Sequence, residues 1–302
     1  MSSLRPGARV GVVAPGGAVD PARLEPGLAL LRAWGLEPVP GPHLLARQRW
    51  FAGSAVERAA DLTWALSAPD LDAAWFARGG SGTGELLGEL PWARLAPDRP
   101  VIGFSDATAL FAALAGRGRR AIHGPVLTTL AEASEDSQAS LRQLLFGGRA
   151  APLPRRQLAG PAQTVTGPVL GGNLTVLASL CGTPWAPRAA GAILLLEDVD
   201  EAPYRLVRAL GQLLAAGVLA GVRGVGLGEL LRCGEPGQAE EALAERLAPL
   251  GVPIVGGLPL GHGPRNLAFP HGAPGRLGAL GLDWGDAPSL APKTPGAVPS
   301  PG

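Results

Sequence analysis

Short apolar runs alternate with amphipathic stretches through the first half of the chain. The apolar runs have the length of buried strands and lie at residues 8–14, 36–39, 72–77, 101–104 and 121–125. The stretches between them predict helices at about 21–34, 54–67 and 105–114. Strands and helices that alternate at this spacing indicate a mostly parallel, doubly wound α/β sheet. Ligands of such sheets bind beyond the carboxyl ends of the strands.

The second half of the chain repeats this alternation after an irregular segment. Residues 147–168 are rich in proline and glycine and show no helical or strand period, which indicates a domain boundary or crossover. Strand-like runs follow at 192–196, 222–227 and 254–255, with helices expected at 203–216 and 239–250. The predicted organisation is an N-terminal α/β domain at 1–148, a linker at 149–168, a C-terminal domain at 169–286 and a disordered tail at 287–302.

Composition and charge narrow the classes of partner. Of the 302 residues, 46% are hydrophobic, and the net charge of +1 gives no electrostatic reason to expect nucleic acid or an anionic membrane as partner. No stretch approaches the ~20 apolar residues of a membrane span, and the N-terminal apolar run is too short for a signal-peptide core. Cys181 and Cys233 form no C-x-x-C pair, so a reducing cytoplasm is the simplest compartment.

Ser105 lies where the fourth predicted strand meets a helix. A strand-to-helix elbow at this point holds a hydroxyl clear of the sheet, as in a serine nucleophile. The match to the G-x-S-x-G elbow is incomplete, because position 107 is alanine. A serine at this place also serves as a helix N-cap. The two interpretations of Ser105 stay open on this segment alone.

The glycine-rich run at 79–84 favours an oxyanion loop over a phosphate loop. It has the G-x-x-x-x-G skeleton, but Glu85 stands where a phosphate loop needs lysine and Leu86 where it needs serine or threonine. Leu87 likewise breaks the G-x-G-x-x-G pattern of dinucleotide-binding loops. A flexible loop without lysine can instead offer backbone N–H groups to a developing oxyanion.

A histidine and a glutamate stand at two further strand ends. None of the four histidines has the close spacing of a zinc site, so no metal is expected. His262 follows an apolar strand in a polar loop, and Glu197 ends the strand at 192–196. A lone histidine in a loop is more often an ordinary exposed residue, and a carboxylate at this place is either a solvated strand end or an orienting group. Together with Ser105 they supply the nucleophile, base and orienting acid of a serine hydrolase, which makes that chemistry the working hypothesis.

Seven segments in order resemble one family, the LD-carboxypeptidases or muramoyltetrapeptide carboxypeptidases, which are serine peptidases. The resemblance covers about residues 8 to 280. The segments are VVAPGG (12–17), ARGGSGTGELL (77–87), VIGFSDATAL (101–110), HGPV (123–126), GGNLTVLASLCGTPW (171–185), ILLLEDVDEAPYRLVRALGQLLAAG (193–217) and GHGPRNLAFPHGA (261–273). The resemblance implies an N-terminal α/β sandwich of the flavodoxin or glutamine-amidotransferase type, a smaller β-rich C-terminal α/β domain and a site between them.

The resemblance also implies roles for individual residues. Ser105 is the expected nucleophile, His262 the base and then acid, and Glu197 its orienting partner, with Glu201 as the rival for that last role. The expected oxyanion donors are the backbone N–H of Asp106 and one N–H of the Gly79–Gly80 loop, which we assign to Gly80. The family needs no metal or cofactor, and its members are commonly homodimers.

Candidate substrate-binding residues follow from the same segments. Arg78 and Arg205 are candidates for holding a free terminal carboxylate, and the alternative for each is an ordinary surface ion pair. Ser81, His123 and Asn173 complete the candidates. The family often has an aromatic residue in place of Ser81 and an aliphatic one in place of His271, so specificity is less defined than catalysis.

The sequence is consistent with three functions. The leading one is hydrolysis of the L,D-peptide bond that releases terminal D-alanine from cytoplasmic murein tetrapeptides, in peptidoglycan recycling. The second is a self-immunity-type peptidase that cleaves a peptidyl-aminoacyl nucleotide antibiotic, with Trp185 stacked on the base, although Trp185 is equally typical of a core residue. The third is a non-catalytic binding protein on the same scaffold. The expected partner is a murein peptide, with no nucleic acid and no membrane.

Overall fold

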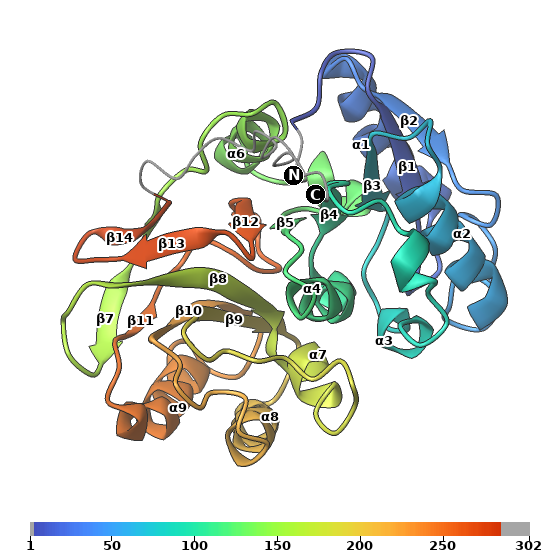
Figure 1. The fold of residues 1–302 in the computed structure, drawn as a ribbon. Helices are drawn as coiled ribbons and strands as arrows, with labels where there is room; N and C mark the ends of the chain where they lie inside the picture. The colour runs from blue at the N-terminus through green and yellow to red at the C-terminus, as the bar shows by residue number, and fades with distance from the viewer. Residues whose placement is uncertain (1–2, 285–302) are drawn as a thin grey trace, which may run out of the picture.

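The computed structural model describes residues 3–284, which form two sheets with helices around them (Figure 1). The N-terminal sheet has the strand order β12-β5-β4-β3-β1-β2. The strands are β1 (Arg9–Val13), β2 (Glu37–Pro40), β3 (Ala73–Phe76), β4 (Val101–Gly103), β5 (Ala121–His123) and β12 (Phe269–His271). Strands β1 to β5 pair in parallel, and β12 joins β5 antiparallel. The doubly wound parallel arrangement predicted from the sequence is thereby confirmed.

Both faces of the N-terminal sheet are covered by helices. The helices are α1 (Pro21–Ala33), α2 (Ala55–Ser67), α3 (Thr83–Leu86), α4 (Thr108–Ala115), α5 (Leu127–Leu130) and α6 (Glu135–Leu145). Side chains alternate along β3, so that Trp75 packs with α1, α5 and α6 while Phe76 packs with α2, α3 and α4. A sheet buried on both faces explains why its strands are continuous apolar runs.

Local signals fix the starts of the two long helices. The Asp20 side chain accepts a hydrogen bond from the N–H of Ala22 at 2.9 Å, and Pro21 occupies the first helical position of α1. Ser54 and Glu57 form the capping box of α2. These caps lie where the sequence predicted the helices to begin.

The C-terminal sheet is mixed and has the order β6-β14-β13-β8-β9-β10-β11-β7. Its strands are β6 (Leu153–Pro154), β7 (Arg156–Ala159), β8 (Val165–Asn173), β9 (Ile193–Val199), β10 (Gly224–Leu231), β11 (Ile254–Gly256), β13 (Pro274–Leu277) and β14 (Gly281–Asp283). Helices α7 (Leu174–Ser179), α8 (Pro203–Ala215) and α9 (Gln238–Leu247) cover one face (Figure 1). The β-rich second half agrees with the predicted fold class.

Two segments depart from the simple division of the chain. Residues 149–168, expected to be an irregular linker, contain β6, β7 and the start of β8. Because β6 and β7 are the two edge strands of the sheet, they accept proline and polar residues that hide the strand period. Near the other end of the chain, β12 leaves the C-terminal half to extend the N-terminal sheet. The predicted domain limits, 1–148 and 169–286, therefore do not coincide with the limits of the two sheets and remain a prediction. The predicted tail at 287–302 lies outside the described residues.

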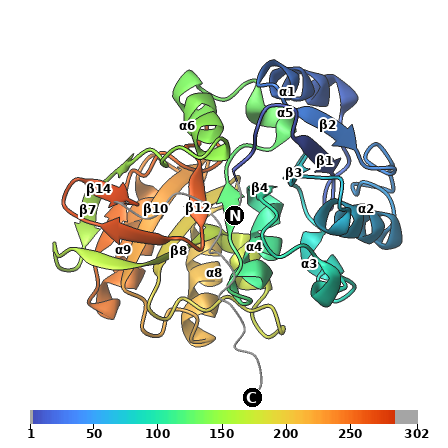
Figure 2. The same ribbon diagram turned by 45° about the horizontal axis from the view of Figure 1, so that its top comes forward.

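The two sheets meet at helix α4, which lies between them in both views (Figure 1 and Figure 2). The N–H of Asn173, at the end of β8, donates to Thr108 Oγ1 in the first turn of α4 at 3.0 Å. The carboxyl ends of β4, β8 and β9 are thus brought to one place. Within residues 3–284, no helix has the length and apolar character needed to cross a membrane.

Candidate active site

Ser105 occupies a strained turn directly after β4. It has a φ of 61°, in the left-handed region that a non-glycine residue enters at a cost of roughly 1–2 kcal/mol. It starts a 3₁₀ turn, Ser105–Ala107, that runs into α4, and its side chain caps neither helical segment. The N-cap interpretation is therefore wrong, and the strained elbow is present although position 107 is alanine.

The Gly79–Gly80 loop lies against this turn. A Cβ added to Gly79 would lie 2.9 Å from both Cβ and Oγ of Ser105, so the close approach requires glycine. Among the described residues, the N–H groups of Gly80 and Asp106 have no hydrogen-bond acceptor. Two free donors beside a serine hydroxyl are the arrangement expected of an oxyanion hole.

The Asp106 side chain holds the end of the glycine-rich loop. Its Oδ2 accepts hydrogen bonds from the N–H of Thr83 at 3.0 Å and from the Thr83 hydroxyl at 2.6 Å. Burial raises the pKa of Asp106, against the hydrogen bonds from Thr83. Asp106 thus joins the loop to the serine turn through its side chain, in addition to offering its N–H.

A buried arginine braces the same loop from α2. Arg58 is 2% exposed and donates to the carbonyl oxygens of Pro15 at 2.6 Å and Gly82 at 3.2 Å. It also pairs with Glu85. Glu85, whose side chain argues against a phosphate loop, therefore binds the arginine that holds the glycine-rich loop in place. Neither Arg58 nor the Asp106 carboxylate was singled out from the sequence, because their partners are distant in the chain.

The C-terminal half brings an imidazole and a carboxylate to Ser105. His262 Nε2 lies 3.0 Å from Ser105 Oγ, and His262 Nδ1 lies 2.7 Å from Glu197 Oε2. Glu197 is fully buried at the carboxyl end of β9, and His262 lies in the loop after β11. The predicted serine, histidine and glutamate therefore form one continuous hydrogen-bonded chain.

The surroundings of His262 and Glu197 shift their pKa values as expected for a base paired with a carboxylate. Burial acts to lower the pKa of His262, but the hydrogen bond and charge of Glu197 outweigh it, so the pKa lies above its ordinary value of 6.5. Burial raises the pKa of Glu197, and the hydrogen bond and charge of His262 oppose that rise. A proton accepted from Ser105 is thus stabilised on His262.

Glu201 and Arg205 lie outside this chain of hydrogen bonds. They pair with each other across one turn, with Arg205 Nη1 at 3.6 Å from Glu201 Oε2, and Arg205 is exposed. Arg205 Nε also lies 3.4 Å from the Tyr204 hydroxyl. This is the surface ion pair that was the alternative interpretation of Arg205. The carboxylate that contacts His262 is that of Glu197.

The remaining substrate-binding candidates divide into exposed and buried residues. Arg78 and Ser81 are exposed and flank the Gly79–Gly80 pair. His123 is 0% exposed and stacks on Phe269, with ring centroids 4.6 Å apart. Burial lowers the pKa of His123 to about 3. The structure places His123 in the core, where it presents no surface to a ligand.

Asn173 also has a structural position. Its Oδ1 accepts from the N–H of Val176 at the start of α7, and its Nδ2 donates to Asp198 at 2.8 Å. The side chain is 5% exposed. Asn173 therefore caps α7 and joins it to β9, and its amide has no free group directed at a substrate.

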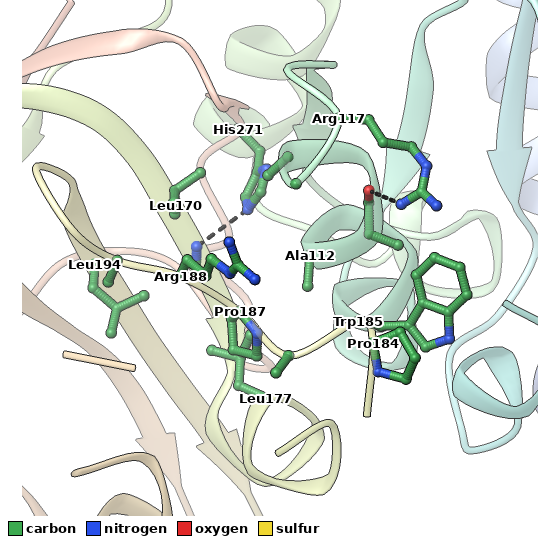
Figure 3. Close-up of a pocket in the computed structure, with 16 residues that line it drawn as sticks. Ala112, Arg117, Leu170, Leu177, Pro184, Trp185, Pro187, Arg188, Leu194 and His271 are labelled. Carbon is green, nitrogen blue, oxygen red and sulfur yellow. Dashed lines mark hydrogen bonds between the residues drawn. The ribbon is translucent and has the colours of Figure 1, made fainter. Parts of the chain in front are cut away.

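A separate cavity of about 350 Å³ lies at the far end of α4 (Figure 3). It is lined by His271, Trp185 and Arg188 among others, and by none of the three residues of the hydrogen-bonded chain. Trp185 packs against Trp92 with centroids 5.4 Å apart, and the Arg117 guanidinium lies over both rings. Trp185 is thus held in a stack beside a cavity that Ser105 does not line.

His271 lines that cavity from the buried strand β12. Its Nε2 accepts a hydrogen bond from the N–H of Gly171 at 3.1 Å. Burial lowers its pKa to about 4, so the ring is neutral. No group of histidine, cysteine, aspartate or glutamate residues within 3–284 could hold a metal ion.

Both halves of the chain match domains of known proteins. The family model of the LD-carboxypeptidase N-terminal domain matches residues 10–124, and that of the LD-carboxypeptidase C-terminal domain matches residues 166–277. A murein tetrapeptide carboxypeptidase of Pseudomonas aeruginosa is 40% identical over 291 residues, which is 91% of this chain and 95% of the relative. The chain belongs to the LD-carboxypeptidase family.

The family resemblance seen in the motifs is thereby confirmed, and the chain is a serine peptidase hydrolase of the LD-carboxypeptidase type. The crystal structure of a muramoyltetrapeptide carboxypeptidase from Oxalobacter formigenes has a TM-score of 0.79 and 30% identity, and the match covers 93% of this chain and 100% of that one. The microcin C7 self-immunity protein MccF of Escherichia coli is more distant, at 26% identity over 296 residues and 86% of each chain.

Proposed function

We propose that this LD-carboxypeptidase releases terminal D-alanine from cytoplasmic murein tetrapeptides during peptidoglycan recycling. The observation that carries the proposal is the hydrogen-bonded chain Glu197–His262–Ser105, which ends beside two unpaired N–H groups. The printed names of the relatives from Pseudomonas aeruginosa and Oxalobacter formigenes supply the substrate class. A cytoplasmic location and a homodimer are part of the same proposal.

In the first half of the reaction, Ser105 Oγ attacks the carbonyl carbon of the bond between the diamino acid and D-alanine. His262 Nε2 accepts the hydroxyl proton, and ionised Glu197 stabilises the resulting imidazolium. The N–H groups of Gly80 and Asp106 donate to the oxyanion. When the carbon–nitrogen bond breaks, His262 gives its proton to the leaving amine of D-alanine, and the tripeptide remains as an ester on Ser105.

In the second half, water attacks the ester. His262 takes a proton from that water, and the same donors hold the second oxyanion. Collapse returns the proton to Ser105 Oγ and frees the tripeptide acid. Each group of the hydrogen-bonded chain is used in both halves, so no further proton carrier is needed.

The test is to incubate the protein with L-Ala-γ-D-Glu-meso-diaminopimelyl-D-Ala, free or linked to UDP, and to measure released D-alanine. A peptide that ends in L-alanine is the stereochemical control. Release that depends on the D-centre supports the proposal. No release from either tetrapeptide, together with cleavage of a peptidyl-aminoacyl nucleotide, would instead assign the self-immunity function.

A further inference from the structure

A second cavity, of about 340 Å³, borders the Gly79–Gly80 loop. Its lining includes three arginines, Arg47, Arg49 and Arg78, together with Trp50, Gly80 and Ser81. We infer that this arginine pocket is a subsite for carboxylate groups of the substrate and that it selects peptides with free carboxylates over amidated ones. The inference rests on the proposed function, of which it specifies the substrate.

The charges of the pocket are unbalanced. No aspartate or glutamate is among the described residues that line it. Arg47 and Arg49 are exposed and have no ion-pair or hydrogen-bond partner within residues 3–284. Guanidinium groups that share a cavity without a counter-charge raise the local concentration of anions. Their planar N–H groups match a carboxylate in two places at once.

Hydrogen bonds hold the backbone that carries the arginines of the pocket. Gln48 and Phe51 exchange two backbone hydrogen bonds of 3.0 Å, which close a tight turn around Arg49 and Trp50. Arg49 has a φ of 56°, a conformation that persists only where its surroundings enforce it. The N–H of Ala18 donates to the Trp50 carbonyl at 2.9 Å, and Arg78 Nη1 donates to the Ala18 carbonyl at 2.5 Å. The turn and Arg78 are therefore held to the same short segment.

The pocket adjoins the site of bond cleavage. Gly80 lines the pocket, while Gly79, its neighbour in the chain, contacts Ser105. Adjacent Cα atoms are about 3.8 Å apart, so the serine turn and the pocket border two neighbouring residues of the same loop. Trp50 is 63% exposed and offers an apolar surface for the aliphatic chain of such a peptide.

The chemistry of the substrate fits these cations. The tetrapeptide carries free carboxylates on the γ-linked glutamate, on the diamino acid and at its terminus. A charge-assisted hydrogen bond contributes more than a neutral one, and loss of one such pair costs about tenfold to a hundredfold in affinity. We therefore expect amidation of a carboxylate seated in the pocket to raise KM by about that factor.

The experiment combines amidated substrates with arginine variants. KM is measured for release of the last residue, which is D-alanine from the tetrapeptide and from the forms amidated at the γ-linked glutamate or at the diamino acid, and D-alaninamide from the form amidated at the terminus. The same series is run with Arg47→Gln and Arg49→Gln. Arg32→Gln is the matched control, because Arg32 is an exposed arginine of α1 that pairs with Glu25 and does not line the pocket.

We expect at least one amidation to raise KM about tenfold or more in the wild type and in Arg32→Gln. In Arg47→Gln or Arg49→Gln, this increase in KM should largely disappear. The amidated position then identifies the carboxylate that is bound. An amidation penalty that is absent, or that is the same in all variants, overturns the inference while D-alanine release upholds the proposed function. If the wild type releases no D-alanine, calorimetric titration still measures the affinity of the same peptides for the wild type and the variants. A loss of affinity on amidation in the wild type but not in Arg47→Gln or Arg49→Gln supports the inference, and equal affinities overturn it.

Discussion

The two sheets contribute to the site in different ways. The N-terminal sheet supplies backbone geometry, namely the left-handed turn at Ser105, the close approach of Gly79 and the free N–H groups of Gly80 and Asp106. The C-terminal half supplies protonation chemistry through His262 and the buried carboxylate of Glu197. The first contribution is therefore sensitive to an added methyl group, and the second to a lost charge.

The largest effect is expected when the nucleophile or its base is removed. Ser105→Ala and His262→Ala should each lower kcat by several orders of magnitude, because each removes one end of the same proton transfer. The double variant should be little worse than either single one, since the two residues act as a unit. Steady-state kinetics of the three variants gives the comparison. Multiplicative losses would show that the two residues act independently.

Loss of the Glu197 charge should have the next largest effect. Glu197→Gln should lower kcat by roughly 10³–10⁴-fold, because the imidazolium is no longer stabilised. Wild-type kcat/KM should fall as the pH drops through a His262 pKa above 6.5, since the base must be neutral to accept a proton. In the variant, burial acts on His262 without the carboxylate of Glu197, so this midpoint should move to a lower pH than in the wild type.

The matched control for that variant is Glu201→Gln. Glu201 pairs with exposed Arg205 and does not contact His262, so its pH profile should match the wild type. A shifted midpoint in Glu201→Gln and an unshifted one in Glu197→Gln would reverse the assignment of the acid.

A single methyl group tests the contribution of the N-terminal sheet. Gly79→Ala should lower kcat by about 10²-fold, because the new Cβ lies within 2.9 Å of the nucleophile and displaces it. Gly84→Ala, at the start of helix α3 in the same glycine-rich run, places its Cβ no closer than 3.7 Å to the nearest atom that packs against it and should leave kcat unchanged. Circular dichroism and thermal unfolding of both variants separate displacement from unfolding. Equal activities of the two variants would contradict the close-approach account.

The smallest effect concerns the imidazoles that have no carboxylate partner. The pKa values of His123 and His271 are about 3 and about 4 in the folded state, against 6.5 for an ordinary histidine. Below pH 6.5 the unfolded chain therefore binds more protons, and each histidine lowers the free energy of unfolding by about 1.4 kcal/mol per pH unit. His271→Gln should reduce that slope by about this amount between pH 6 and about 5. Urea titrations across this range measure it, and an unchanged slope would show that His271 is charged when folded.

The sequence predicted the residues of the hydrogen-bonded chain because each follows an apolar strand. Parallel strands place their carboxyl ends together, so Ser105, Glu197 and His262 could be grouped from their positions alone. The choice of Glu197 over Glu201 was a preference in the sequence that the geometry supports, since Glu197 hydrogen-bonds to His262, whereas Glu201 lies beyond the end of β9 and pairs with Arg205.

Features that depend on distant contacts were not predictable in the same way. Strand β12 extends the other sheet, and nothing in its three residues indicates that pairing. His123 and Asn173 stand in motif segments, but whether a side chain faces solvent depends on packing by Phe269 and Asp198 far along the chain. Arg47 and Arg49 carry no motif, and only the turn that faces Ala18 brings them beside the glycine-rich loop.

The most direct test of the account is to separate binding from bond cleavage at Ser105. Calorimetry should show that Ser105→Ala binds the murein tetrapeptide about as tightly as the wild type, since Oγ contributes mainly to the transition state. In a single-turnover assay, the same variant should release D-alanine at least 10⁴-fold more slowly than the wild type. Release by Ser105→Ala at a rate close to that of the wild type would contradict the role of Ser105 as the nucleophile.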